Sequence, residues 1–418
     1  MADLLANPKI CGACSTPACE LKCACKLVFY CGAACQRKHW PEHKQVCTVA
    51  LAKKIRKARR EHGKDDFGVV KARMDAANAL RQQGRFKDAE RCFLEARGIC
   101  VRVEGEGSAN VGEVSRVLGD MYGEMGRHDD AMKELEEGLQ IARIVNGERS
   151  REAAAALQCI GKVVSYQGKH EESQARMEEA HSILKETVGA DHPDVGVILS
   201  FKGTTYARMG RPAEALAALQ EALRIQRLSC DDDSHEVAGT LGNLGNLLSM
   251  MGMQADAIDK YEEALGVLRR VHGERHPEVA DAFSNIATAL ARQGQLDQAI
   301  KMYKKALKIR RRALGENHQD VGMTLENIGF TCYKLGKHSE ALEMLEEALA
   351  VYNRALGIDN HHNAKVHYSI ALAQYASLDV GGALENARES VRIFKKLGVD
   401  NGKSQEVAQF LTILQEMA

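Results

Sequence analysis

The sequence predicts an all-α protein: a superhelix, or α-solenoid, of about eight 42-residue helix-turn-helix units behind a small cysteine-rich head. Glycine recurs every 42 residues from Gly84 to Gly336, and the spacing never slips. Eight of the thirteen cysteines lie before residue 48. Aromatic residues make up only 5% of the chain and prolines number six, whereas a β-sandwich or barrel would contain more strand formers and turn prolines.

The charge distribution, like the cysteine distribution, separates the first residues of the chain from the rest. Residues 1–69 contain 13 Lys and Arg against 6 Asp and Glu, while the remainder contains 44 against 51. No apolar stretch approaches the length of a membrane span, and the first residues lack the apolar core of a secretory signal. We therefore expect an intracellular protein, cytoplasmic in preference to nuclear, with no membrane partner. Its cysteines would be reduced there, which favours metal binding over disulfides.

The head, residues 11–47, contains cysteine and histidine at metal-ligand spacing. Thiolates and imidazoles are the ligands that zinc prefers, four to each ion in a tetrahedron. The segment is too short to fold on its own apolar core, and bound zinc would supply about 10–16 kcal/mol for each structural ion. Eight ligands leave no open coordination position. We therefore expect two structural Zn²⁺ ions, held by Cys11, Cys14, Cys23, Cys25, Cys31, Cys35, His43 and Cys47.

The order of these residues resembles the MYND zinc finger. The resemblance rests on the run Tyr30-Cys31-x3-Cys35-Gln36 followed by Trp40, His43 and Cys47. It implies a protein-binding finger, because family relatives take short proline-containing peptides. The chain departs from the family at its second pair, where Cys-x-Cys replaces Cys-x2-Cys, so Cys19 remains an alternative to Cys23. The implied pairing puts Cys11, Cys14, Cys31 and Cys35 on one zinc and Cys23, Cys25, His43 and Cys47 on the other.

A basic segment follows the head, in residues 48–69. Lys and Arg recur there at helical spacing, which is typical of a solvated helix that caps the finger. A nuclear-import signal or a nucleic-acid contact is the alternative. No aromatic residues alternate with the charges, so stacking on single-stranded nucleic acid is unsupported. We expect a basic linker helix and do not expect nucleic acid as a partner.

Residues 70–405 divide into eight units that keep the period of 42. The apolar residues of 257–268 follow the i, i+3, i+4, i+7 pattern of an amphipathic helix, and a second apolar stretch precedes Gly252. Each unit is therefore two helices joined at the glycine, with small residues where helices cross. Residues 406–418 fit a closing helix over the last apolar face. One series of small residues is Ala89, Ala131, Ser173, Ala215, Ala257, Ala299, Ala341 and Ala383.

This pattern resembles the tetratricopeptide repeat (TPR). The usual TPR unit has about 34 residues, and the extra residues here follow the second helix, as in 271–277. Similar 42-residue units with Leu-Gly and His-Pro punctuation occur in kinesin light chains. The resemblance implies a superhelix whose first helices line a concave, protein-binding groove. Leu378 departs from the pattern, because it stands where the other units have the turn glycine.

One groove-side position carries asparagine in three successive units. Asparagine inside a helix costs helix propensity, so a binding role would explain its recurrence. Its amide offers two donors and an acceptor, which suits an extended peptide backbone, and basic residues nearby favour an acidic peptide. The resemblance to kinesin light chains implies the same use. A solvated face that repeats only by duplication is the alternative. The candidate peptide-binding residues are Asn243, Asn246, Asn285, Asn327, Arg208, Arg292 and Lys334.

These features predict a non-enzymatic protein–protein interaction adaptor or scaffold, with protein partners held by the finger and by the groove. MYND fingers also occur in SET-domain lysine methyltransferases, but residue 70 already starts the first repeat and leaves no room for a SET domain. Its Asn-His-x-Cys motif is missing, as are Walker A, Gly-x-Gly-x-x-Gly and His-Glu-x-x-His motifs. The alternatives are a relative of those enzymes without the catalytic domain, and a nuclear or nucleic-acid-binding regulator acting through the basic head.

Overall fold

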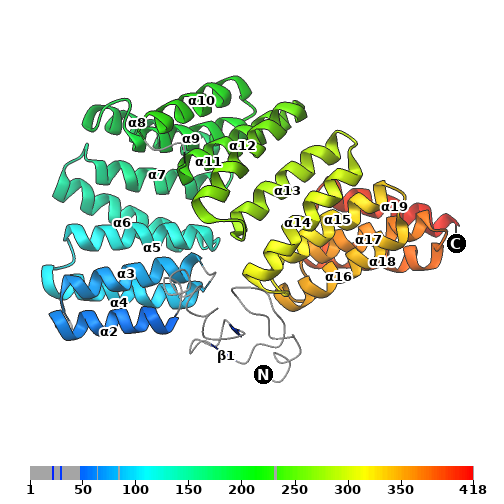
Figure 1. The fold of residues 1–418 in the computed structure, drawn as a ribbon, viewed down its shortest axis with the longest axis horizontal. Helices are drawn as coiled ribbons and strands as arrows, with labels where there is room; N and C mark the ends of the chain where they lie inside the picture. Colours follow the sequence, from blue (N-terminus) through cyan, green and yellow to red (C-terminus); the bar gives the residue numbers. More distant parts are fainter. Residues whose placement is uncertain are drawn as a thin grey trace. The chain divides into compact units, whose positions relative to one another are not determined.

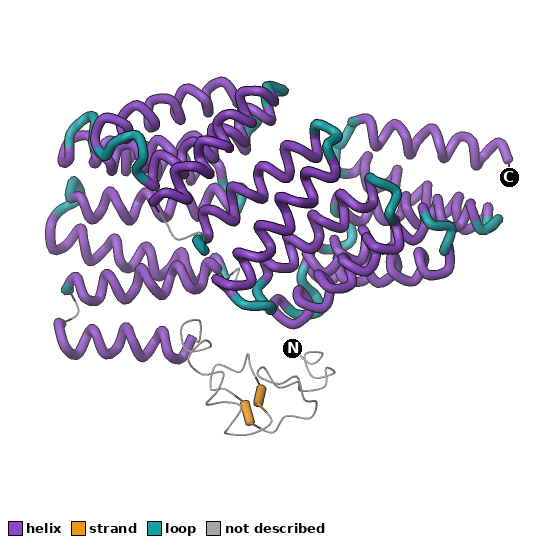
Figure 2. The backbone as a smooth tube through the Cα atoms, turned by 45° about the horizontal axis from the view of Figure 1, so that its top comes forward, coloured by secondary structure: helices purple, strands orange, loops and turns teal. Residues whose placement is uncertain are grey.

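The described part of the chain is almost entirely helical, with short loops between helices (Figure 1, Figure 2). This confirms the predicted all-α repeat architecture. The chain divides into two compact units, Met1–Ala190 and Asp191–Ala418. Among the described helices, none is long and apolar enough to cross a membrane. The structure, a computed structural model, describes residues 21–22, 29–30, 48–63, 65–82, 85–229 and 233–417.

The first unit begins with a small antiparallel sheet and continues as helices. Strand β1 (Leu21–Lys22) pairs with β2 (Phe29–Tyr30), with Leu21 opposite Tyr30 and Lys22 opposite Phe29. A single helix then precedes three helix pairs. The helices are α2 (Thr48–His62), α3 (Phe67–Gln82), α4 (Phe86–Glu104), α5 (Ala109–Glu124), α6 (His128–Asn146), α7 (Arg151–Tyr166) and α8 (His170–Thr187).

The second unit contains five further helix pairs and a last single helix. The final helix begins at Gly402, earlier than the segment 406–418 expected from the sequence, and packs against α18. Its buried side chains are Val407 and Leu414. The helices are α9 (Pro193–Arg208), α10 (Pro212–Ser229), α11 (His235–Met250), α12 (Gln254–His272), α13 (Pro277–Arg292), α14 (Leu296–Leu314), α15 (Gln319–Lys334), α16 (His338–Leu356), α17 (His361–Ala376), α18 (Val380–Lys396) and α19 (Gly402–Met417).

The first helix of each pair, from α5 to α17, begins with a side-chain cap. The capping side chain accepts a hydrogen bond from a backbone N–H two or three residues further on, which satisfies one of the free donors at a helix start. Three of the caps are histidines that accept through Nδ1. This gives the recurring histidines a structural role. The caps are Ser108, Ser150, His192, Ser234, His276, His318 and Asn360.

Small residues lie where the two helices of a pair cross. The series that runs from Ala89 to Ala383 is fully buried in all eight units. A Cβ atom at Gly203 would lie 2.5 Å from Cγ of Leu219, and one at Gly245 would lie 2.5 Å from Cε1 of Tyr261. Real Cβ contacts are longer than this, so glycine is what lets these backbones approach.

The turn inside the second to eighth pairs contains a residue with positive φ. Glycine adopts it at 71–82° in the second to seventh pairs, where an L residue would be strained. In the eighth pair Leu378 stands there, with φ at 66°. Gly84, the first of the series, lies outside the described residues.

Several consecutive first helices contact one another directly. In the first unit α5 contacts α7, and in the second unit α11 contacts both α9 and α13 while α15 contacts α17. This arrangement leaves one row of first helices with a shared exposed side in each unit. We call that side, formed in the second unit by α9, α11, α13 and α15, the first-helix face. It is the surface that the sequence analysis predicts to be the groove.

Candidate interaction sites

The eight predicted zinc ligands lie outside the described residues, as does Cys19. The structure therefore describes only the short hairpin within the finger, β1 and β2. In the sequence, Cys23 directly follows β1 and Cys31 directly follows β2. The donor set itself, thiolates with one imidazole, suits zinc.

The basic segment forms α2, which packs against α3 of the first repeat. Its charged side chains are mostly exposed. Nζ of Lys54 lies 2.5 Å from Oδ2 of Asp75, and Lys57 pairs with Glu61 one turn further along the same helix. Exposed ion pairs of this kind contribute little to stability, typically about 0–1 kcal/mol. The helix thus covers the start of the repeat array with a solvated basic side.

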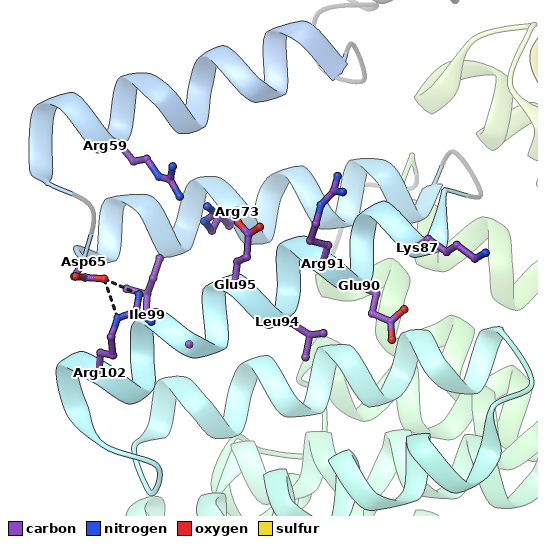
Figure 3. Close-up of a pocket in the computed structure, with 11 residues that line it drawn as sticks. Arg59, Asp65, Arg73, Lys87, Glu90, Arg91, Leu94, Glu95, Ile99 and Arg102 are labelled. Carbon is purple, nitrogen blue, oxygen red and sulfur yellow. Dashed lines mark hydrogen bonds and ion pairs between the residues drawn. The ribbon is translucent and has the colours of Figure 1, made fainter.

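A cavity of about 670 Å³ lies between α2, α3 and α4 and was not anticipated from the sequence (Figure 3). Arg59 of α2, Arg73 of α3 and Arg91 of α4 line it together with Glu95. The Arg73 side chain is buried and pairs with Glu95, while its Nε atom has no hydrogen-bond partner among the described residues. Burial, followed by the charge of Arg59, lowers the pKa of Arg73. No motif in the sequence marks this cavity, because its residues come from three helices.

The first helices of the first unit are joined by a chain of charges. Nη2 of Arg81 on α3 lies 2.6 Å from Oδ2 of Asp120 on α5, and Nζ of Lys162 on α7 lies 2.7 Å from Oδ1 of the same carboxylate. Glu124 also pairs with Arg81. Burial alone would raise the pKa of Asp120, but the Lys162 ammonium and the Arg81 guanidinium hold it below its ordinary value. The two cations and the two carboxylates are thus paired with one another within the first unit.

The first-helix face of the second unit combines polar, charged and apolar side chains. The structure places the three predicted asparagines there, on α11, α13 and α15, each half-buried. Nδ2 of Asn243 donates to Oγ of Ser200 on α9, at 3.2 Å. Oδ1 of the exposed Asn246 accepts from the hydroxyl of Tyr261, at 2.7 Å. These two amides thus take part in holding the unit together, a role that was not predicted from the sequence.

Asn285 and Asn327 differ from Asn243. Their side-chain amides make no hydrogen bond among the described residues, although each is half-buried on the first-helix face. A half-buried amide normally finds a partner, because an unmade hydrogen bond costs free energy. The three asparagines share one repeat position, but only Asn243 makes a hydrogen bond to the preceding first helix, although Asn327 has Ser284 at the position of Ser200.

The three predicted basic residues are exposed at the C-terminal ends of the first helices. Nη1 of Arg292 donates to Oγ of Ser249 at 2.8 Å, which ties α13 to α11. Nζ of Lys334 lies 4.8 Å from the ring centroid of Phe330, within the range of a cation–π contact. Arg208 is exposed at the last residue of α9. The basic edge is therefore present, with Arg292 partly engaged by the protein.

The described cysteines of the repeats fill space. Cys100, Cys159 and Cys332 are buried and Cys92 is half-buried, all as free thiols. Burial raises the pKa of each of these thiols, so they are poor nucleophiles. Cys230 lies outside the described residues.

The helix pairs define a class, the α-solenoid repeat proteins, and comparison with known families names the repeat. A family model for the tetratricopeptide repeat matches six segments, the last five of them overlapping, that extend over more than half of the chain. The chain therefore belongs to the tetratricopeptide repeat family. A family model for the MYND finger matches residues 11–47, and a finger of this family implies zinc binding. The TPR matches are residues 69–144, 152–228, 197–270, 236–312, 278–354 and 320–396.

Several solved structures are similar to this chain at low sequence identity. A signal transduction ATPase (STAND) protein with a tetratricopeptide repeat sensor from Pyrococcus horikoshii is 16% identical, with a TM-score of 0.58 over 83% of this chain and 49% of that one. A Rap protein complexed with Competence and Sporulation Factor is 12% identical, with a TM-score of 0.53 over 83% and 98%. A putative kinesin light chain from Podosopora anserina is 18% identical, with a TM-score of 0.45 over 50% and 99%. Among curated proteins there is no significant match.

Proposed function

We propose that the protein is an interaction adaptor whose first-helix face binds an extended, acidic segment of a partner protein. The observation that supports this most directly is the pair Asn285 and Asn327. They occupy the same repeat position on consecutive first helices, are half-buried, and have no hydrogen bond among the described residues. Both amides are thus free to pair with a peptide backbone, which offers donors and acceptors in alternation.

Charge would set the preference for an acidic segment. Lys334 and Arg208 are exposed at the ends of their helices, and Arg292 keeps further N–H donors beyond the one that reaches Ser249. Such rim charges mainly speed association and select partners, rather than supplying most of the affinity. The asparagine amides would bind the peptide backbone whatever its sequence. The basic side chains of Arg208, Arg292 and Lys334 would favour acidic peptides over neutral ones.

The finger would provide a second docking surface. Its eight ligands would hold two structural zinc ions, with no open coordination position for catalysis. A zinc-stabilised finger at one end and a repeat array behind it would let one chain hold two proteins. Two separate docking surfaces on one chain would make the protein an adaptor between two partners.

The double variant Asn285→Ala with Asn327→Ala tests the first-helix face. Two lost hydrogen bonds at about 0.5–1.5 kcal/mol each should weaken binding by about tenfold. The probe is a set of short synthetic acidic peptides, with neutral peptides of equal length, titrated against the full chain by fluorescence polarisation. Stability should not fall, because alanine has the higher helix propensity.

A matched control removes two amides elsewhere. Gln220 and Gln298 are exposed on the second helices α10 and α14 and make no hydrogen bond among the described residues. Changing both to Ala should leave peptide binding unchanged. Equal binding by the asparagine variant and the wild type would exclude the first-helix face, and the finger would then be the remaining docking surface. An asparagine variant that unfolds would show that these amides support the fold.

A further inference from the structure

We infer that His235, His272 and Glu278 form a binding site for a zinc ion, separate from the finger. The three side chains converge at one place in the second unit, from three different helices. His235 is the first residue of α11, His272 is the last residue of α12, and Glu278 lies in the first turn of α13. An ion here would join the ends of three helices.

The distances between the ligand atoms suit a tetrahedral ion. Nδ1 of His235 lies 3.2 Å from Oε2 of Glu278, and Nε2 of His272 lies 3.4 Å from the same oxygen. The two nitrogens are 3.4 Å apart. Zinc bound at about 2.0–2.1 Å in a tetrahedron separates its ligands by about 3.3–3.4 Å. The three atoms therefore already stand at the spacing that one zinc ion requires, and water would take the fourth position.

The cluster needs a proton or a cation between its three ligand atoms. With neutral imidazoles, the two facing nitrogens can each present a lone pair to the Glu278 carboxylate, so that three acceptors meet. Oε2 of Glu278 is buried and has no hydrogen-bond donor in suitable geometry among the described residues. Either protons or a metal ion must occupy the space between these atoms. Two imidazoles and one carboxylate are a ligand set that zinc uses, and such a set leaves one position open.

The repeats supply an internal comparison. An acidic residue recurs at the position of Glu278, as Glu236 and Asp320 in the neighbouring pairs, where it favours the positive start of a helix. The two histidines do not recur with it. One pair further along, the positions of His235 and His272 carry Pro277 and Leu314. The repeat fold alone thus explains the carboxylate but not the two imidazoles beside it.

His276 supports the site without joining it. Its ring stacks on that of His272, with centroids 4.3 Å apart and planes 19° apart. Its Nδ1 accepts the hydrogen bond from the backbone N–H of Glu278 that caps α13. The cap therefore fixes His276, whose stacked ring restricts the plane of the His272 ring, and Nε2 of His272 lies 3.4 Å from Oε2 of Glu278.

The test counts zinc in the full chain. Protein loaded with zinc at the finger is dialysed against buffered free zinc, and the metal per chain is measured by atomic emission. The wild type should hold one zinc more than His235→Ala, His272→Ala or Glu278→Gln, or should bind that ion at least about 100-fold more tightly. Two matched controls occupy the same repeat positions in other pairs: His361→Ala for His235, and Asp320→Asn for Glu278. Both should keep the extra ion.

A second measurement guards against variants that misfold. Added zinc should raise the thermal midpoint of the helical far-UV signal in the wild type and in both controls, because an ion that binds only the folded helices stabilises them. The midpoint of the three cluster variants should not respond. An equal zinc count in the wild type and in all folded cluster variants would overturn the site and leave an imidazole–carboxylate hydrogen-bonded group.

Discussion

Among the described residues, Leu378 is the single non-glycine residue with a positive φ, at 66°. A left-handed backbone costs an L residue about 1–2 kcal/mol, and Leu378 recovers nothing by burial because its side chain is 88% exposed. Changing Leu378→Gly should raise the free energy of unfolding by about 0.5–1 kcal/mol, after the greater freedom of glycine in the unfolded chain is subtracted. Urea denaturation followed by far-UV circular dichroism measures the difference.

Leu397 is the control, because it also lies just after a helix but has an ordinary φ of −80°. Leu397→Gly should lower the free energy of unfolding by at least about 0.5–1 kcal/mol, through the entropy of glycine and the loss of the buried part of the side chain. If both variants were destabilised, the turn at Leu378 would not be strained.

At the scale of the helix, glycine decides how closely two backbones approach. A Cβ at position 245 would meet the buried ring of Tyr261, whose hydroxyl is held by Asn246. Changing Gly245→Ala should therefore destabilise the protein by about 1–3 kcal/mol, as overpacked core sites do. On the same helix, Gly242 faces open space. Gly242→Ala should stabilise by about 0.5–1 kcal/mol, so a shared loss of stability would show that helix crossing is not the cause.

Charges that join neighbouring helices make stability depend on pH. The pKa of Asp120 is below its ordinary value in the folded protein because of Lys162 and Arg81, which outweigh its burial. Its stabilisation is then fully present above the unfolded pKa and is lost as the pH falls through the folded pKa. Asp120→Asn should cost about 1–3 kcal/mol at neutral pH, since these side chains are partly exposed. The difference from wild type should shrink below about pH 4.

Denaturation curves across pH check this, with Asp259→Asn as the control. Asp259 is exposed on α12 and has no ion pair among the described residues. Its replacement should change stability little at any pH. A constant difference between wild type and Asp120→Asn from neutral to acid pH would mean that the carboxylate charge is not what matters.

The helices and turns could largely be predicted from the sequence, because the same pattern of apolar and small residues recurs in every repeat. Eight phased copies of one apolar pattern identify two helices and a turn even where a single copy would be ambiguous. Contacts between copies could not be predicted in the same way. Asn243 and Asn285 share a repeat position, yet only the former faces a serine, Ser200, on the preceding first helix. Such differences depend on the residue 42 or 43 positions away, so they appear only in three dimensions.

A candidate site can be predicted from the sequence when its residues are close together in the chain, and not when only the fold brings them together. The finger ligands are close in the chain, so their spacing alone predicts zinc. His235 and His272 are far apart in the chain and each lies near a loop, where histidine is unremarkable. Their convergence on Glu278 needs the fold of α11, α12 and α13. The cavity beside Arg73 needs α2, α3 and α4 together.

At the scale of the whole molecule, two kinds of stability operate in one chain. The repeats of the second unit share a continuous apolar core from Ala215 to Ala373, and helices of this kind are held by burial. The finger has too few residues for such a core and would depend on metal. Removing the metal should therefore act on one part and leave the other intact.

Trp40 makes this separation measurable, because it is the single tryptophan of the chain and lies within the finger segment. Chelation of zinc should shift its fluorescence emission as the finger loses its structure, while the helical far-UV signal hardly changes. An ion at His235, His272 and Glu278 would be removed as well, but its loss should only lower the thermal midpoint of helices that remain packed. Return of zinc should restore the emission. Collapse of the helical signal on chelation would show instead that metal, and not burial, holds the repeats together.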